Sequence, residues 1–181
     1  MRLIALTALV ATAIPALAMP PLPRKAPEFT ITEGGGKESL LTSYRGKVVV
    51  LAFVHTTCIH CQAFSGVLTR LHKELGPRGF QPIDVAWNPE AEKLVPGFIK
   101  DIGIDFPVGH SEWDPIMSFL GFSMLERPVV PLVVVIDRKG MIRAQSPSQG
   151  DPNLQDETKL RALIETLLTE GATSKAGKSK R

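Results

Sequence analysis

A pair of cysteines at the junction of an apolar run and a helical segment constrains the fold more than any other feature. Residues 48–54 are all apolar, which is typical of a strand buried on both faces. The run leads into Cys58-Ile59-His60-Cys61, and apolar side chains recur at helical spacing over residues 62–75. Two thiols with this spacing, placed between a strand and a helix, indicate a redox-active dithiol.

The position of each thiol predicts its role. Cys58 comes first, where the partial positive charge of a helix N-terminus favours a thiolate, so we expect it to be the nucleophile. Cys61 lies one turn further on and should be the more buried, resolving thiol. The chain has two cysteines, so the intramolecular bridge it can form closes a very short loop and adds little stability. A functional role is therefore favoured over a structural one.

Two histidines flank or interrupt the motif. His60 can stabilise the Cys58 thiolate by charge or by a hydrogen bond, which would make the disulfide more oxidising; the alternative is an exposed side chain without effect. His55 is either a proton acceptor for the dithiol or an ordinary residue at a strand end. A zinc site built from both histidines and both cysteines would need an awkward tetrahedron across a strand end and a helix start. We therefore predict no metal and no cofactor.

Composition bounds the class of protein. The 181 residues are 44% hydrophobic and 22% charged, as in an ordinary globular domain, which argues against a disordered or multi-span membrane protein. The net charge of +3 is too small to suggest a nucleic-acid partner.

The first residues predict export. Arg2 precedes an apolar stretch, and Ala16-Leu17-Ala18 forms an A-x-A cleavage signal, so residues 1–18 are expected to be a signal peptide cut after Ala18. The protein would then be periplasmic or otherwise exported, with no stable membrane span after cleavage. The alternative is an uncleaved N-terminal membrane anchor, for which the apolar stretch is short.

The remaining chain is expected to form one domain between a linker and a tail. Residues 19–27 are Pro-rich and predict an extended linker, 28–170 the domain, and 171–181 a basic disordered tail. Strands are expected at 28–32, 39–41, 48–54, 81–87, 132–136 and 141–145, and helices at 62–75, 90–100, 114–120 and 156–169. Pro89 should open the second helix and Asp114 cap the third. This order predicts a three-layer α/β/α sandwich with a mixed central sheet, preceded by a β-hairpin.

Residues 26–168 carry a family likeness. The motifs are Ala26-Pro27-Glu28-Phe29, Arg45-Gly46-Lys47, the C-x-x-C segment, Phe106-Pro107-Val108, and Val130-Pro131 with the following Asp137-Arg138-Lys139-Gly140. With these the chain resembles the thioredoxin superfamily, in particular exported TlpA/ResA-type thiol–disulfide oxidoreductases. It is also similar to the broader redoxin group that includes peroxiredoxins.

The resemblance implies further site residues. In this family the proline before the late apolar strand is cis and faces the dithiol, and Pro131 matches it. Val130 would then pair with an extended substrate segment. Thr57 stands where the family usually has Trp before the first cysteine, and it is also expected at the substrate.

The sequence also departs from the family at two acidic positions. Ala52 replaces a buried Asp common in thioredoxins, and Phe64 replaces a Glu found in several TlpA/ResA proteins. The likeness favours a reductase, whereas His60 and the missing carboxyls favour an oxidant.

The predicted function is disulfide exchange with cysteines of other exported proteins, supported by an upstream redox partner protein. Two alternatives use the same dithiol. A peroxiredoxin-like peroxidase would need a Thr where His55 stands and a proline between Lys47 and Cys58, which is absent. A Cu(I)-binding assembly factor would use the thiols as soft ligands with His55 or His110, although its usual cysteine spacing is one residue longer.

Overall fold

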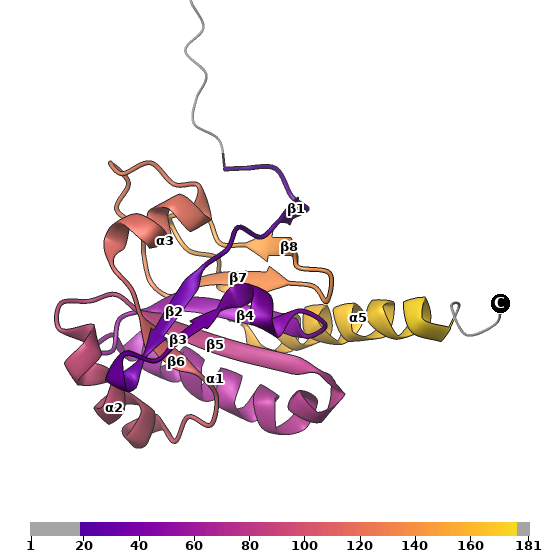
Figure 1. Ribbon diagram of the computed structural model, residues 1–181, viewed down its shortest axis with the longest axis horizontal. Coiled ribbons are helices and arrows are strands. Elements are labelled where there is room, and N and C mark those ends of the chain that lie inside the picture. The colour runs from indigo at the N-terminus through magenta and orange to yellow at the C-terminus, as the bar shows by residue number, and fades with distance from the viewer. Residues whose placement is uncertain (1–18, 177–181) are drawn as a thin grey trace, which may run out of the picture.

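The computed structural model describes residues 19–176 (Figure 1). The predicted signal peptide, residues 1–18, lies outside the described residues, as does the end of the predicted tail, residues 177–181. The chain forms an eight-stranded sheet in the order β1-β8-β7-β4-β5-β6-β2-β3. No helix within residues 19–176 combines the length and the apolarity that crossing a membrane requires.

The centre of the sheet is mixed and buried. β4 (Val48–Val54), β5 (Phe80–Ala86) and β6 (Val108–His110) run parallel, while β7 (Leu132–Ile136) pairs antiparallel with β4 and β8 (Met141–Gln145) antiparallel with β7. Every residue of β4, β5 and β7 is buried. The apolar composition of β4 and β7 predicts this, whereas β5 also buries Gln81 and Asp84.

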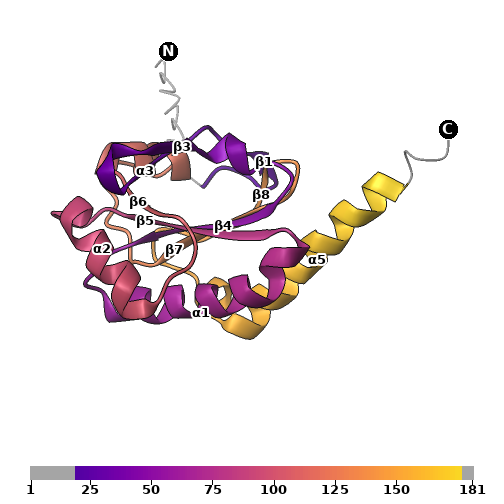
Figure 2. The same cartoon turned by 60° about the horizontal axis from the view of Figure 1, so that its bottom comes forward.

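Helices cover both faces of this sheet (Figure 2). The helices are α1 (Ile59–Leu75), α2 (Ala91–Ile102), α3 (Trp113–Leu120), α4 (Pro152–Gln155) and α5 (Glu157–Ala176). Alternate residues of β4 face two separate cores: Ala52 and Val54 contribute to the core under α1, α2 and α5, whereas Leu51 and Phe53 contribute to the core under α3. The predicted three-layer sandwich is therefore confirmed.

An N-terminal hairpin extends the sheet beyond β6. β2 (Thr30–Glu33) pairs antiparallel with β3 (Glu38–Leu40) and with β6. A Cβ at Gly109 would come within 2.5 Å of the Ile31 side chain, so glycine is needed for β2 to approach β6 this closely. The predicted hairpin extension is present.

The segment expected to be a linker, residues 19–27, instead contributes a strand. β1 (Arg24–Lys25) pairs antiparallel with β8 at the edge of the sheet, and the Ala26 N–H donates to the Gly140 carbonyl at 2.9 Å. The Arg24 guanidinium donates to the Gln145 side chain at 2.8 Å and to the Phe119 carbonyl at 3.0 Å. Prolines are tolerated here because an edge strand needs few ladder N–H groups.

Helix ends differ from the predicted ones. α1 begins earlier, with Cys58 as its N-cap. α2 begins at Ala91 because Glu90 has a left-handed backbone (φ 58), so Pro89 does not open the helix. α3 begins at Trp113, so Asp114 lies in its first turn and is not the cap. α5 continues to Ala176, past the predicted end, because one glycine costs a helix only about 1 kcal/mol; the first residues of the predicted disordered tail are thus helical.

Candidate active site

The two thiols lie at the N-terminus of α1 and differ in exposure. Cys58 is the N-cap residue, with an extended backbone (φ −85, ψ 119), and is half-buried. Cys61 lies in the first turn and is completely buried. Both are free thiols in this structure. The exposed-then-buried order matches the order predicted for a nucleophile followed by a resolving thiol.

The buried thiol is held in its protonated form. Burial raises the pKa of Cys61 well above its usual range, and the neighbouring Cys58 and Asp84 act in the same direction. The backbone N–H of His55 donates to the Cys61 Sγ at 3.4 Å, which opposes this rise only in part. A thiol in this state must lose its proton before it can attack a disulfide.

The loop that precedes Cys58 is fixed by side chains that the sequence analysis missed. The Thr56 N–H donates to the Asn88 Oδ1 at 2.8 Å, and the Gln62 amide donates to the Thr56 carbonyl at 2.9 Å. The Cys58 N–H donates to the His55 carbonyl at 3.1 Å. Asn88 lies two residues after the end of β5, and a polar residue just past a strand end was the available signal.

The two histidines and Thr57 differ in their exposure to solvent. The ring of His55 packs edge-on against Trp87 with centroids 4.2 Å apart, and burial lowers its pKa. His55 therefore reaches the dithiol through its backbone, while its Nε2 has no hydrogen-bond partner within residues 19–176. His60 and Thr57 are exposed beside the thiols. The chemical roles of these three residues stay predictions.

The segment before β7 contacts the same core as the thiols. The Val130–Pro131 peptide bond is cis, and half-buried Val130 packs against the core cluster that includes Cys61 and that Cys58 also contacts. The Pro131 carbonyl accepts a hydrogen bond from the Gln155 amide of α4 at 3.3 Å. Leu132 at the start of β7 is the register partner of Phe53 in β4, so the Val130–Pro131 segment lies beside the chain that leaves β4 toward Cys58.

A buried carboxyl also reaches this region, and the sequence analysis did not identify it. Asp84 in β5 is completely buried, and the hydroxyl of Ser65 in α1 donates to its Oδ2 at 2.6 Å. Its Oδ1 has no hydrogen-bond partner among the described residues. Burial raises the pKa of Asp84 to about 7. The available signal was an aspartate inside an otherwise uncharged strand.

The two positions where the family's carboxyls are missing are both apolar core. Ala52 is completely buried in β4 and is the register partner of Asp84 in the parallel pair with β5. Phe64 fills the same core from α1. The acidic group is therefore found one strand away from its expected place.

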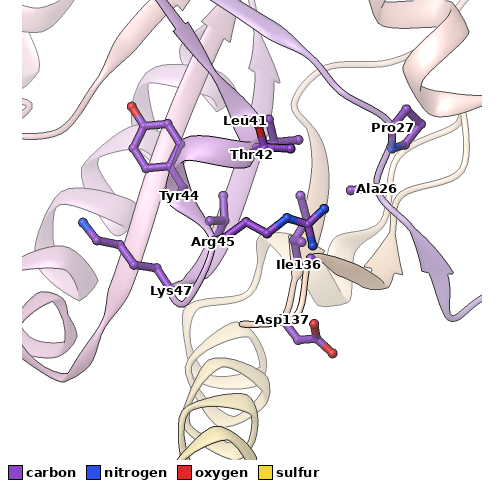
Figure 3. Close-up of a pocket in the computed structure, with 11 residues that line it drawn as sticks. Ala26, Pro27, Leu41, Thr42, Tyr44, Arg45, Lys47, Ile136 and Asp137 are labelled. Carbon is purple, nitrogen blue, oxygen red and sulfur yellow. The ribbon is translucent and has the colours of Figure 1, made fainter.

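A pocket away from the dithiol is lined by residues that include Arg45, Ile136 and Asp137 (Figure 3). Its walls include Val49 near the start of β4 and Ile136 at the end of β7, whereas Cys58 follows the far end of β4. The Arg45 guanidinium donates to the Lys139 carbonyl there, and the Gly46 N–H donates to the Arg138 carbonyl at 3.0 Å. The Arg-Gly-Lys and Asp-Arg-Lys-Gly motifs thus join two loops and lie away from the thiols.

The described part of the chain has no cluster of side chains arranged as a metal site. No group of three or more His, Cys, Asp or Glu side chains within residues 19–176 is arranged to hold an ion. The site consists instead of two thiols, a buried carboxyl and the loop that positions them.

Comparison with known proteins places the chain in a family. The family model described as the AhpC/TSA family matches residues 22–145. The chain is 29% identical over 119 residues to a thiol-disulfide oxidoreductase ResA from Geobacillus thermodenitrificans, and the match covers 65% of this chain and 64% of that one. It is 31% identical over 114 residues to a Xenopus laevis protein whose name places it with the glutathione peroxidases, covering 55% of this chain and 54% of that one. The chain thus spans about two thirds or less of the length of these relatives.

The solved structures agree on the fold. A thiol:disulfide interchange protein of the thioredoxin family from Chlorobium tepidum superposes with a TM-score of 0.68 at 23% identity, over 82% of this chain and 99% of that one. This likeness, together with the layered mixed sheet, shows a thioredoxin-like fold. With more than half of its residues matched by the family model, the chain belongs to the AhpC/TSA family.

Proposed function

We propose that the protein is a thiol–disulfide oxidoreductase that exchanges disulfides with cysteines of other exported proteins. One observation carries the proposal: a half-buried thiol caps α1, and a completely buried thiol follows it one turn later. The relatives named as ResA support the same activity. Val130 precedes β7 at the end of the sheet where β4 leads to Cys58, and a backbone at this place suits pairing with an extended peptide segment.

The exchange takes place in two steps. The Cys58 thiolate attacks one sulfur of a substrate disulfide, forming a mixed disulfide and releasing the other substrate sulfur as a thiolate, which takes a proton from solvent. Cys61 then loses its proton and attacks the Cys58 sulfur, forming the Cys58–Cys61 disulfide and releasing the second substrate thiol. Two electrons have passed to the substrate, and an upstream redox partner protein would restore the dithiol. The reverse sequence oxidises a substrate dithiol.

The proposed location is the periplasm or another exported compartment. Its support is the sequence of residues 1–18, which has the charged start, apolar stretch and A-x-A site of a signal peptide. An uncleaved N-terminal anchor is the alternative. Mass spectrometry of the mature protein after expression with its own N-terminus distinguishes the two, because cleavage would leave Met19 as the first residue.

A redox titration tests the activity. The protein is equilibrated in graded glutathione buffers, free thiols are alkylated, and the Cys58–Cys61 state is read by mass spectrometry. We expect a reversible two-electron transition, near about −270 mV for a thioredoxin-like reductant or near about −120 mV for an oxidant. The variants Cys58→Ser and Cys61→Ser should each abolish it. Failure of the wild-type pair to form an intramolecular disulfide would contradict the proposal.

Peroxide reduction is the second candidate. Its support is the match to a relative named as a glutathione peroxidase. Against it stands His55, which occupies the position where a peroxiredoxin-like site would need Thr. Consumption of hydrogen peroxide by the reduced wild type, absent in Cys58→Ser, would establish it; a rate no faster than that of free thiols would exclude it.

A further inference from the structure

The exchange scheme leaves a proton without an acceptor. Cys61 must become a thiolate to attack the mixed disulfide, yet its side chain is completely buried, so bulk water does not reach the sulfur. The raised pKa of Cys61 makes spontaneous loss of this proton to solvent rare. An internal base close to the first turn of α1 would remove this obstacle.

Asp84 is the buried carboxyl that faces this turn. Ser65 lies four residues after Cys61, so both side chains project from the same face of α1 toward the sheet. The Ser65 hydroxyl donates to Asp84 at 2.6 Å, which places the carboxyl directly under that face. The Asp84 carboxyl also acts electrostatically on Cys61. Its Oδ1 has no partner within residues 19–176, so one oxygen can still accept a proton.

We infer that Asp84 receives the proton that Cys61 loses when Cys61 attacks the mixed disulfide. The inference rests on the proposed disulfide exchange and deepens it by naming the internal proton acceptor. Asp84 contacts no substrate atom in this scheme and acts on Cys61 from the core side. The same carboxyl returns the proton when the disulfide is reduced again.

The proton balance of the resolving step is complete. The Cys61 S–H bond breaks, its proton moves to the Asp84 carboxylate, and the sulfur electron pair forms the bond to Cys58. The bond between Cys58 and the substrate sulfur breaks, and that sulfur leaves as a thiolate. Asp84 holds this proton until the Cys58–Cys61 disulfide is reduced again, and the leaving thiolate takes a proton from solvent. No oxidant other than the substrate disulfide is consumed.

The ring of His55, the other candidate acceptor, packs against Trp87, which belongs to the core under α3 and not to the core that holds Cys61. The register partners of Asp84 are Ala52 in β4 and Val108 in β6, and neither titrates. From α1 the titratable groups on this side are the thiols of Cys61 and Cys58. The helices α2 and α5 of the same layer direct apolar residues into this core, and no Asp, Glu, Lys, Arg or His side chain of residues 91–102 or 157–170 is buried. The pH dependence of the resolving step should therefore follow the protonation of the Asp84 carboxyl.

A single-turnover assay separates the two thiols. The reduced protein is mixed with 5,5′-dithiobis(2-nitrobenzoic acid): Cys58 attack releases one coloured thiolate, and Cys61 attack releases the second. In the wild type we expect the rate of the second release to rise with pH around the pKa of Asp84, about 7. In Asp84→Asn the first release should be unchanged, while the second should slow by about 10- to 100-fold and lose its rise near neutral pH.

Two further variants distinguish a proton acceptor from a structural residue. Ser65→Ala keeps the carboxylate but removes a hydrogen bond that lowers its pKa, so the rise in the second rate should move to higher pH. Asp105→Asn removes an exposed carboxylate that pairs with His72 far along α1, and it should match the wild type in both phases. Thermal melts confirm that each variant is folded.

The outcomes separate the inference from the proposed function. If the wild type releases both thiolates and Asp84→Asn does so with the same second rate and the same pH profile, Asp84 is not the acceptor and the inference is wrong. The role of Asp84 is structural if two results occur together. Ser65→Ala would leave the pH profile of the second release unchanged, and Asp84→Asn would slow the first and the second release by the same factor. If the wild type releases only the first thiolate, the proposed exchange itself fails.

Discussion

At the scale of single residues, the two cysteines are made unequal by their surroundings. Cys58 stands at a helix cap with part of its surface open, and Cys61 is closed off by the core. The same chemical group therefore has two functions, because solvent access decides which sulfur meets an outside partner. The apolar Ile59 between them is 74% exposed, so a partner that covers the thiols would also cover this side chain.

His60 provides a prediction at this scale. It is exposed in the first turn of α1, where a positive charge would stabilise the Cys58 thiolate and hence the reduced form. We expect His60→Gln to make the reduction potential more negative by roughly 10–30 mV, where 30 mV corresponds to about 1.4 kcal/mol.

Redox titration of the variant in glutathione buffers measures this shift. Lys73→Gln, which removes an exposed charge near the other end of α1, is the matched control and should leave the potential unchanged. Equal potentials for His60→Gln and the wild type would rule out an influence of His60 on the dithiol.

At the scale of elements, a residue that follows β5 fixes the loop between β4 and α1 by a hydrogen bond. Asn88 accepts the N–H of buried Thr56, and replacing it with Ala would leave that N–H unpaired. We expect Asn88→Ala to lower the free energy of unfolding by about 1–3 kcal/mol. Urea denaturation measures the loss. Asn153→Ala removes an exposed contact to Lys159 and should change stability by less than about 0.5 kcal/mol; a loss of the same size in both variants would contradict the role given to Asn88.

Local patterns predicted the elements that position the thiols, and non-local contacts account for what was missed. The apolar run of β4, the C-x-x-C segment and the periodicity of α1 all lie within one stretch of chain, so their arrangement could be predicted. The burial of Asp84 depends on the register of β5 against β4 and on the docking of α1, which no local pattern encodes. The two-residue strand β1 exists because β8, far along the chain, offers it partners.

At the scale of the whole molecule, Asp84 should make stability depend on pH. Its pKa in the folded protein is about 7, above that of an exposed aspartate, so its contribution to stability is fully present below about pH 4 and is lost as pH rises through 7. Relative to Asp84→Asn, the wild type should lose on the order of 4 kcal/mol of unfolding free energy across this range.

Urea denaturation of the reduced wild type and of Asp84→Asn between about pH 4 and pH 8 measures the difference. His55, whose pKa is lowered by burial, affects both proteins equally and cancels in the comparison. Asp105→Asn should follow the wild type at every pH. A wild-type-to-Asp84→Asn difference that stays constant with pH would show that Asp84 does not titrate in this range.

The pairing of β1 with β8 has a consequence for the order of events during synthesis. Residues 24 and 25 leave the ribosome before all the other strands of the sheet, whereas their partners Ile142 and Met141 lie in β8, which is made last. The earliest strand therefore waits unpaired while the sheet is made, and closing so long a loop is a late and slow event. Until then the outer edge of β8 has no neighbour, and the nascent molecule is briefly open to pairing with another chain along that edge.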